Sequence, residues 1–229
     1  NAGQPCIAPD SVLILFSRLE ECVAALTRAV AELYPSLADN PDYSSIAGER
    51  HFHRLRGIVD DARSRGGRVI EINPAAAFFG EQTRKLPLVL VLDADEGMRA
   101  MQEEIFGPVL PVHTYIEIAE AIDYVNGHPR PLALYWFGND ATRRDRVLTQ
   151  TLSGGVTVND TLWHFCQDNL PFGGVGASGF GAYHGEQGFR TFSKQKPVFY
   201  QRRPNGIRLL YPPDGRRSEA LIRLLWRSV

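Results

Sequence analysis

SVLILF, residues 11–16, is a continuous apolar run that opens the regular structure of the chain. A short run of this kind is typical of a strand buried on both faces of a sheet. Apolar side chains then recur at helical spacing through residues 17–34, which predicts a helix with one buried side: Leu19, Cys22, Val23, Leu26, Val30 and Leu33. A strand followed at once by an amphipathic helix indicates an α/β protein.

The same alternation continues along the chain. Strands are predicted at 68–72, 87–92, 109–115, 132–137 and 155–158. Helices are predicted around Phe52–Ala62, over 118–125 and over 140–151, and a final extended strand at 196–201. The predicted fold class is α/β, a mostly parallel sheet with helices on both faces, plus an extended C-terminal oligomerisation strand.

Composition narrows the class of protein. The formal net charge of the 229 residues is −1, and no Lys/Arg run interleaves with aromatic residues, so we expect no nucleic-acid partner. No apolar run approaches the roughly 20 residues that span a bilayer, so we expect no membrane partner. Five arginines between 202 and 217 are interpreted as a solvated basic tail. Three widely spaced cysteines favour reduced thiols in a cytoplasmic protein, and their spacing predicts no metal site.

Cys6 is the candidate nucleophile. It lies in a Gly/Pro-rich turn that leads into the first strand, where loops of α/β sheets place their sites. Backbone N–H groups in such a turn favour a thiolate and, later, an oxyanion. An inert thiol stays an alternative, because most free cysteines are core residues. Cys22 falls on an apolar helix face and is interpreted as core, and Cys166 lies in a loop.

Two further segments carry polar or Gly-rich patterns. In MQEEIFGP, residues 101–108, Glu104 can accept hydrogen bonds from a sugar diol while Phe106 packs against a planar ring; a solvated helix end is the alternative. Gly174, Gly176 and Gly179 spell GxGxxG, but no suitable strand precedes them and no βαβ unit follows. We therefore predict a tight loop there.

Five stretches together resemble the aldehyde dehydrogenase superfamily, in particular its class 3 and bacterial coniferyl-aldehyde-dehydrogenase branch. They occur in the family's order and span almost the whole chain: NAGQPCIAPD at 1–10, TRKLP at 83–87, MQEEIFGPVLPV at 101–112, PLALYWF at 131–137, and DNLPFGGVGASGFGAYHGEQGFRTFSKQKPV at 168–198. The chain resembles the C-terminal, catalytic half of such an enzyme.

The resemblance implies a reaction and a set of site residues. Cys6 would attack an aldehyde to give a thiohemiacetal, and hydride transfer to NAD or NADP would leave a thioester that water hydrolyses to a carboxylic acid. Glu104 would hold the nicotinamide ribose and Phe106 would pack beside the nicotinamide. Trp163 and Phe165 would lie near the substrate entrance, which suits an aromatic or long apolar aldehyde.

The resemblance also implies an organisation of the chain. Residues 1–192 would form the catalytic domain, and residues 193–229 an oligomerisation arm and tail that pair two copies into a homodimer. Since the chain begins at Asn1, we expect that the first catalytic strand and helix, the cofactor domain, the general-base glutamate and the oxyanion-hole asparagine lie upstream of it. Pro5 stands where the branch has threonine and Ser11 where it has tyrosine.

Two other functions stay open at this point. The chain could keep the fold as a non-catalytic remnant or an oligomerisation module. It could also be a thiol-dependent esterase, because a cysteine beside an oxyanion site can be acylated by activated esters without any nicotinamide.

Overall fold

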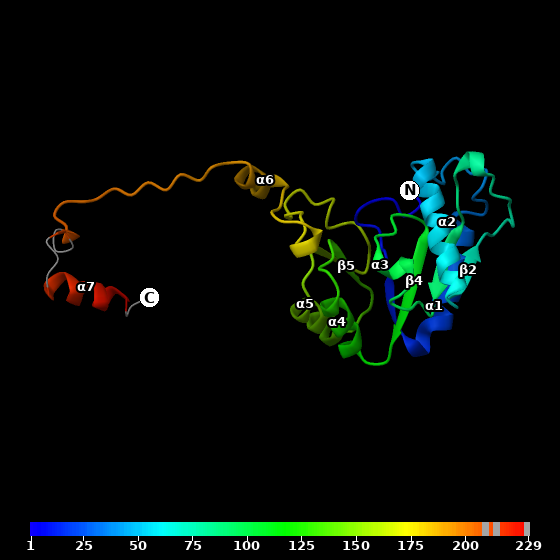
Figure 1. Cartoon of the computed structure of the whole chain (residues 1–229), viewed down its shortest axis with the longest axis horizontal. Helices are drawn as coiled ribbons and strands as arrows, with labels where there is room; N and C mark the ends of the chain where they lie inside the picture. Colours follow the sequence, from blue (N-terminus) through cyan, green and yellow to red (C-terminus); the bar gives the residue numbers. More distant parts are fainter. Residues whose placement is uncertain (208–210, 213–215, 227–229) are drawn as a thin grey trace. The chain divides into compact units, whose positions relative to one another are not determined.

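The computed structural model describes residues 1–207, 211–212 and 216–226. The chain divides into two compact units, residues 1–192 and residues 193–229 (Figure 1), and each is described by itself. No helix among the described residues is both long enough and apolar enough to cross a bilayer.

A four-stranded sheet forms the centre of the first unit. Its order is β1 (Val12–Leu15), β4 (Val109–Tyr115), β3 (Leu88–Leu92) and β2 (Arg68–Ile72). The first three strands run parallel, and β2 is antiparallel to β3. The central strand β3 is apolar along its whole length because both of its faces are covered.

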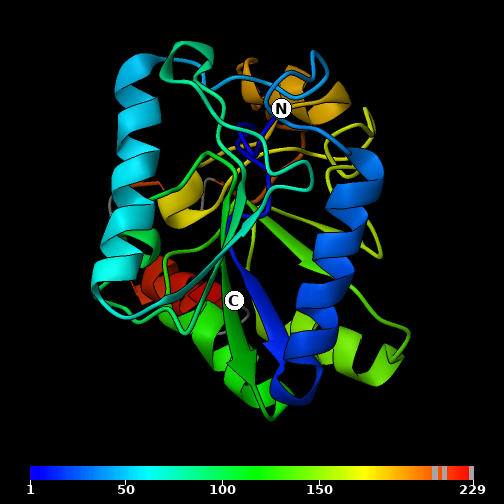
Figure 2. The ribbon, with the colours of Figure 1, turned by 90° about the vertical axis from the view of Figure 1, so that its right-hand side faces the viewer.

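Two helices cover opposite faces of this sheet. Side chains alternate between the faces of a strand, so Val89 and Val91 pack against α2 (Glu49–Ser64), whereas Leu90 and Leu92 pack towards α1 (Leu19–Leu33). Figure 2 shows α2 and α1 on the two sides of the sheet. The predicted fold class, a mostly parallel sheet with helices on both faces, is confirmed.

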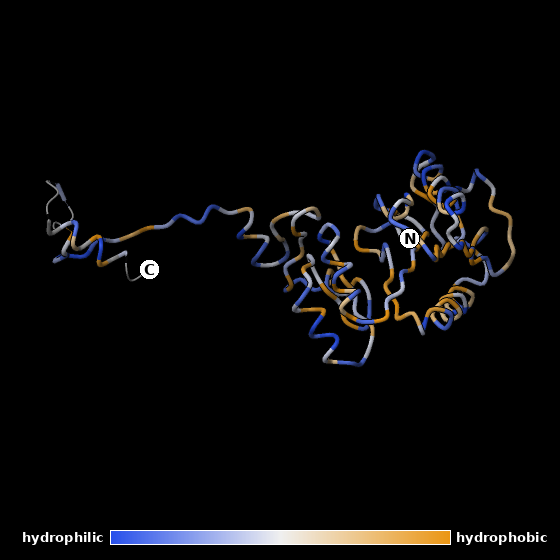
Figure 3. Tube along the Cα trace, turned by 60° about the horizontal axis from the view of Figure 1, so that its bottom comes forward, coloured by the Kyte–Doolittle hydropathy of each residue, from blue (hydrophilic) through white to orange (hydrophobic). Residues whose placement is uncertain are grey.

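The remaining strands form a separate pair, a division that the sequence did not predict. β5 (Ala133–Trp136) and β6 (Gly155–Val158) are parallel. Helices α4 (Ile118–Gly127) and α5 (Ala141–Gln150) pack with this pair and with Leu13 of β1 in one apolar cluster. Hydrophobic and hydrophilic residues alternate along the helices of the first unit (Figure 3).

Three helices were not predicted: α3 (Arg99–Gln102), α6 (Gly185–Thr191) and α7 (Arg216–Trp226). Single 3-10 turns lie at 16–18, 81–83 and 176–178. α6 contains two glycines, which lower helix propensity by about 1 kcal/mol each. The predicted basic tail includes a helix, since Arg216 and Arg217 begin α7.

The second unit begins with an extended segment. Residues 194–200 form no strand within the single chain, so the predicted strand at 196–201 is not present in one copy. An extended segment has unpaired backbone donors until a neighbouring strand is supplied. Its pairing with a second copy stays a prediction.

Candidate active site

The turn that carries the candidate nucleophile is residues 1–10, here called the nucleophile turn. The amide of Ala8 donates to the carbonyl of Pro5 over 3.0 Å, which closes a tight turn around Cys6 and Ile7. Ile7 is buried, whereas Cys6 is exposed. Pro5 contributes only its carbonyl to this turn, so the donor that proline lacks is not needed there.

Two contacts fix the nucleophile turn to the rest of the unit. Gly3 has a φ of +71°, and a Cβ there would lie 2.3 Å from the carbonyl oxygen of Gly107. The side chain of Gln4 donates to the carbonyl of Ser45 and accepts from the amide of Ala47, over 3.1 and 2.9 Å. Only glycine at position 3 permits the close approach of its backbone to that of Gly107.

The loop of residues 103–106, here called the Glu104 loop, lies beside the nucleophile turn. The turn precedes β1 and the loop precedes β4, and because these neighbours are parallel, both segments reach the amino edge of the sheet. Asp10 joins them, since its Oδ1 accepts a hydrogen bond of 3.0 Å from the amide of Ile105. Segments almost a hundred residues apart therefore meet at one edge.

Arg54 of α2 binds the Glu104 loop through several hydrogen bonds. Its guanidinium donates to Glu103 Oε2 over 2.7 Å, to the carbonyl of Glu104 over 3.0 Å and to the carbonyl of Ile105. Arg54 therefore binds the backbone carbonyl of Glu104, whereas the Glu104 side chain remains exposed. A free carboxylate on a fixed backbone suits a ligand hydroxyl pair.

Phe106 adopts a conformation that is unusual for a side chain of its size. Its φ is +54°, and its carbonyl makes a 2.8 Å hydrogen bond with Nε2 of His51. The two rings lie 6.2 Å apart, and the phenyl ring is half-buried. A strained residue of this kind is frequent at ligand sites, where the surroundings hold it.

The pKa values of two carboxyl groups beside the loop shift in opposite directions. Burial would raise the pKa of Glu103, but hydrogen bonds from Arg54 and Arg99 outweigh it and lower that pKa. Burial, followed by the nearby charge of Glu104, raises the pKa of Asp10 above its usual range although backbone amides donate to it. The site is therefore a small, partly neutralised acidic edge beside Cys6.

A third segment reaches the nucleophile turn from β5. The hydroxyl of Tyr135 donates to the carbonyl of Ile7 over 2.6 Å, and its ring lies 6.0 Å from that of His164. His164 lies between Trp163 and Phe165, which are 56% and 41% exposed. Residues 159–166, here called the aromatic loop, thus present two exposed aromatic side chains close to the turn.

The aromatic loop has its own internal support. His164 is buried, and its Nδ1 lies 2.8 Å from the hydroxyl of Thr157. Burial lowers the pKa of this imidazole, which favours its neutral form. Phe165 packs edge-on against Phe172 with ring centroids 4.9 Å apart.

Comparison with known proteins shows the family to which this chain belongs. The sequence pattern of the aldehyde dehydrogenase family matches residues 1–198. The chain belongs to the aldehyde dehydrogenase family. The resemblance drawn from the five stretches is confirmed.

Three similar proteins illustrate the relationship. A probable coniferyl aldehyde dehydrogenase of Caulobacter vibrioides is 54% identical over 94% of this chain and 45% of its own length. The substrate-bound structure of Staphylococcus aureus AldH has 34% identity and a TM-score of 0.81, over 98% of this chain and 48% of its own. A mutant of aldehyde dehydrogenase C from Pseudomonas syringae, in complex with NAD+ and octanal, has 27% identity and a TM-score of 0.72, over 83% of this chain and 39% of its own. The chain thus spans about half the length of the relatives it matches.

The other two thiols of this aldehyde dehydrogenase chain lie elsewhere. Cys22 is partly buried on α1, and burial followed by the charge of Glu21 raises its thiol pKa. The sequence predicted Cys22 as a core residue, but its side chain is only partly buried. Cys166 is exposed at the end of the aromatic loop. Within the described residues, no cluster of three or more His, Cys, Asp or Glu could hold a metal ion.

The Gly-rich segment is a tight loop, as predicted, and opens no dinucleotide-binding helix. A Cβ at Gly174 would lie 2.0 Å from the carbonyl of Ser178, and Gly176 and Gly179 have φ values of +62° and +139°. The glycines therefore allow the backbone to pass close to itself.

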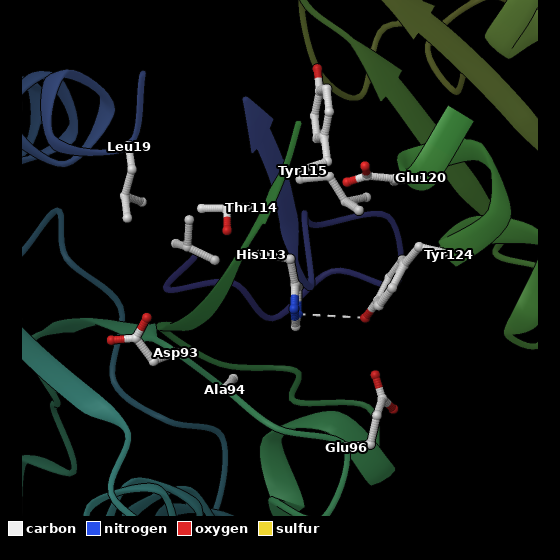
Figure 4. Close-up of a pocket in the computed structure, with 11 residues that line it drawn as sticks. Leu19, Asp93, Ala94, Glu96, His113, Thr114, Tyr115, Glu120 and Tyr124 are labelled. Carbon is white, nitrogen blue, oxygen red and sulfur yellow. Dashed lines mark hydrogen bonds between the residues drawn. The ribbon is translucent and has the colours of Figure 1, made fainter. Parts of the chain in front are cut away.

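A crevice of about 330 Å³ lies at the opposite, carboxyl edge of the sheet. Figure 4 shows the acidic side chains Asp93, Glu96 and Glu120 around it, with His113 and Tyr124 joined by a 3.4 Å hydrogen bond. None of the predicted site residues lines it. The predicted residues Cys6, Glu104 and Phe106 lie instead in the segments at the amino edge.

The sequence patterns did not indicate four residues of the candidate site: Asp10, His51, Arg54 and Tyr135. Asp10 and Tyr135 lie inside two of the recognised stretches, so their position in those motifs could have singled them out. His51 and Arg54 lie one helical turn apart on α2, but such spacing on a solvated helix is too common to indicate a site.

Proposed function

We propose that this chain is the catalytic half of an NAD(P)-dependent aldehyde dehydrogenase, with Cys6 as its nucleophile. The proposal rests on one observation above all. The nucleophile turn and the Glu104 loop meet at one edge through Asp10, and Tyr135 contacts both the turn and His164 of the aromatic loop. A nucleophile, a cofactor contact and an apolar wall are among the parts that aldehyde oxidation needs.

Cys6 would perform the covalent steps. Its thiolate adds to the aldehyde carbon to form a thiohemiacetal, and loss of hydride from that carbon leaves a thioester. Water then breaks the C–S bond, which releases the carboxylic acid and regenerates the thiol. Its exposure in a closed turn supports this role, because the attacking sulfur must reach the substrate.

The nicotinamide cofactor would accept the hydride when bound. The Glu104 loop fits its sugar edge: the carboxylate of Glu104 is exposed while Arg54 fixes its backbone, and Phe106 offers a half-buried ring. Binding of NAD+ by the Pseudomonas syringae relative is consistent with this assignment. This chain covers 45% of the length of the Caulobacter vibrioides relative, and the residues that would hold the rest of the cofactor are expected in the part of such an enzyme that the chain does not cover.

The aromatic loop supports an aromatic or long apolar aldehyde as substrate. Trp163 and Phe165 expose large apolar surfaces beside the nucleophile turn, and such surfaces favour ligands with flat or extended apolar bodies. The name of the Caulobacter vibrioides relative points the same way, since coniferyl aldehyde carries an aromatic ring.

The assembly and location of the enzyme are also proposals. A homodimer would pair the extended residues 194–200 of one copy with a second copy, which would supply the missing strand partner. The free state of all three cysteines supports a reducing, cytoplasmic location.

The proposal is tested with a fused protein in which this chain follows the N-terminal half of the Caulobacter vibrioides relative. Coniferyl aldehyde and NAD are added, and absorbance at the NADH band is followed. We expect aldehyde-dependent NADH formation that falls to background in Cys6→Ala and persists in Cys22→Ala. Turnover that survives Cys6→Ala would refute the assigned nucleophile.

A further inference from the structure

We propose that Tyr135 is a positioning residue that fixes the nucleophile turn relative to the aromatic loop, and so sets the preference of Cys6 for aromatic reactants. This inference rests on the proposed function, because it presumes that Cys6 is the reacting group. The hydroxyl group of Tyr135 on β5 would set the position of Cys6 relative to the aromatic loop.

The hydrogen bond of Tyr135 gives the first step of the argument. Its hydroxyl donates to the backbone carbonyl of Ile7 over 2.6 Å, a contact between residues 128 apart in sequence. Ile7 follows the nucleophile directly and is buried. A bond to the backbone at this point restrains the direction in which the exposed Cys6 side chain leaves the turn.

The same side chain also contacts the aromatic loop. Its ring centroid lies 6.0 Å from that of His164, a buried residue of that loop. Two positions before His164, Leu162 has a φ of +69°, a strained value that surrounding contacts must hold.

Tyr135 therefore contacts both segments: its hydroxyl donates to the turn, and its ring lies near His164 of the aromatic loop. Burial raises the pKa of Tyr135, so the hydroxyl keeps its proton and remains a donor at neutral pH. A phenyl ring in its place would keep the ring contact but remove the hydrogen bond to Ile7.

Selective alkylation of the full 229-residue chain tests the inference. Cys6 is labelled with iodoacetamide or with N-benzyl iodoacetamide, and peptide mapping gives the rate at each cysteine. The aryl preference is the ratio of the benzyl rate to the small-reagent rate at Cys6. A general change in stability alters both rates alike, so the ratio reports positioning.

We expect an aryl preference above one in the unchanged chain, and a fall of about threefold to tenfold in Tyr135→Phe, the factor for one hydrogen bond. Tyr115→Phe is the matched control, because Tyr115 packs with the apolar cluster of α4 and α5, away from the nucleophile turn, and its ratio should not change. Trp163→Ala should lower the ratio as Tyr135→Phe does.

Three results would overturn the inference. An unchanged ratio in Tyr135→Phe, with Cys6 still the fastest thiol, refutes the positioning role but leaves the proposed function intact. Absence of any aryl preference in the unchanged chain refutes it as well. Cys6 labelling no faster than Cys22 and Cys166 removes the nucleophile itself, and the proposed function fails with it.

Discussion

The carboxylate of Glu103 is shared by two guanidinium groups. Arg54 reaches one of its oxygens over 2.7 Å and Arg99 reaches the other over 2.8 Å. The pKa of Glu103 is lowered because these contacts outweigh its burial. A carboxyl group whose pKa falls on folding stabilises the folded state above its unfolded pKa, and this contribution is lost as the pH falls.

Glu103→Gln should therefore lower the free energy of unfolding at pH 7, and its difference from the unchanged chain should shrink as the pH falls below 4.5, the unperturbed pKa of Glu103. Urea denaturation at several pH values measures this. Asp145→Asn is the control, because the exposed Arg144–Asp145 pair should contribute little at any pH. A difference for Glu103→Gln that stays constant down to pH 3 would contradict the account.

Sequence patterns singled out the proposed site residues but not the residues that contact their segments. Cys6, Glu104 and Phe106 lie in short motifs, so their grouping could be expected. Asp10 and Arg54 act through contacts with backbone atoms of other segments. Such contacts depend on how strands and helices are placed, which no local pattern in a single sequence specifies.

Helix α2 supports the Glu104 loop through its apolar side as well as through Arg54. Leu55 is fully buried, and a Cβ at Gly107 would lie 2.6 Å from its methyl groups. The glycine lets the chain that enters β4 rest directly on this leucine. The core and the candidate site are thus continuous at this point.

Leu55→Ala should lower the free energy of unfolding by about 2–5 kcal/mol, because it leaves a cavity beneath the loop. Leu33→Ala removes the same atoms from a side chain that is 74% exposed and should change stability by no more than about 0.5 kcal/mol. Chemical denaturation compares the two variants. Equal effects would mean that α2 does not pack as described.

The elements with strong apolar periodicity were predicted almost to the residue. The strands at 68–72, 109–115 and 155–158 have the predicted bounds. α6 was missed because its glycines weaken any helical pattern, and the split into two sheets was missed because strand runs do not reveal their neighbours. Local patterns determine elements, whereas pairing depends on contacts between distant residues.

The proposed reaction also requires a held nicotinamide cofactor and a general base. Residues 1–207, 211–212 and 216–226 include no strand and glycine-rich turn of the dinucleotide-binding type. Without a held cofactor, hydride transfer loses a proximity advantage of about 7–11 kcal/mol. A missing general base typically costs a further factor of about 10²–10⁴.

The 229-residue chain alone should therefore form no measurable NADH from benzaldehyde and NAD, whereas the fused protein should. Absorbance at the NADH band, measured side by side for the two proteins, gives the comparison. Clear turnover by the chain alone that disappears in Cys6→Ala would place the cofactor site within this chain and contradict the division proposed.

The extended residues 194–200 should pair two copies. Deleting everything after Ser193 should reduce the dimer fraction in sedimentation, because the deletion removes the backbone donors that would add a strand to the partner. Circular dichroism confirms that the shortened chain is folded. An unchanged sedimentation profile for a folded, shortened chain would count against the arm.

The most direct test of the account is to locate the acyl group formed during turnover. The fused protein, supplied with coniferyl aldehyde and NAD, is quenched in acid and digested, and mass spectrometry identifies the modified cysteine. A thioester on Cys6, absent when NAD is left out, is the predicted result. Continued NADH formation with no acyl group on Cys6, or with the acyl group on Cys22 or Cys166, would contradict it.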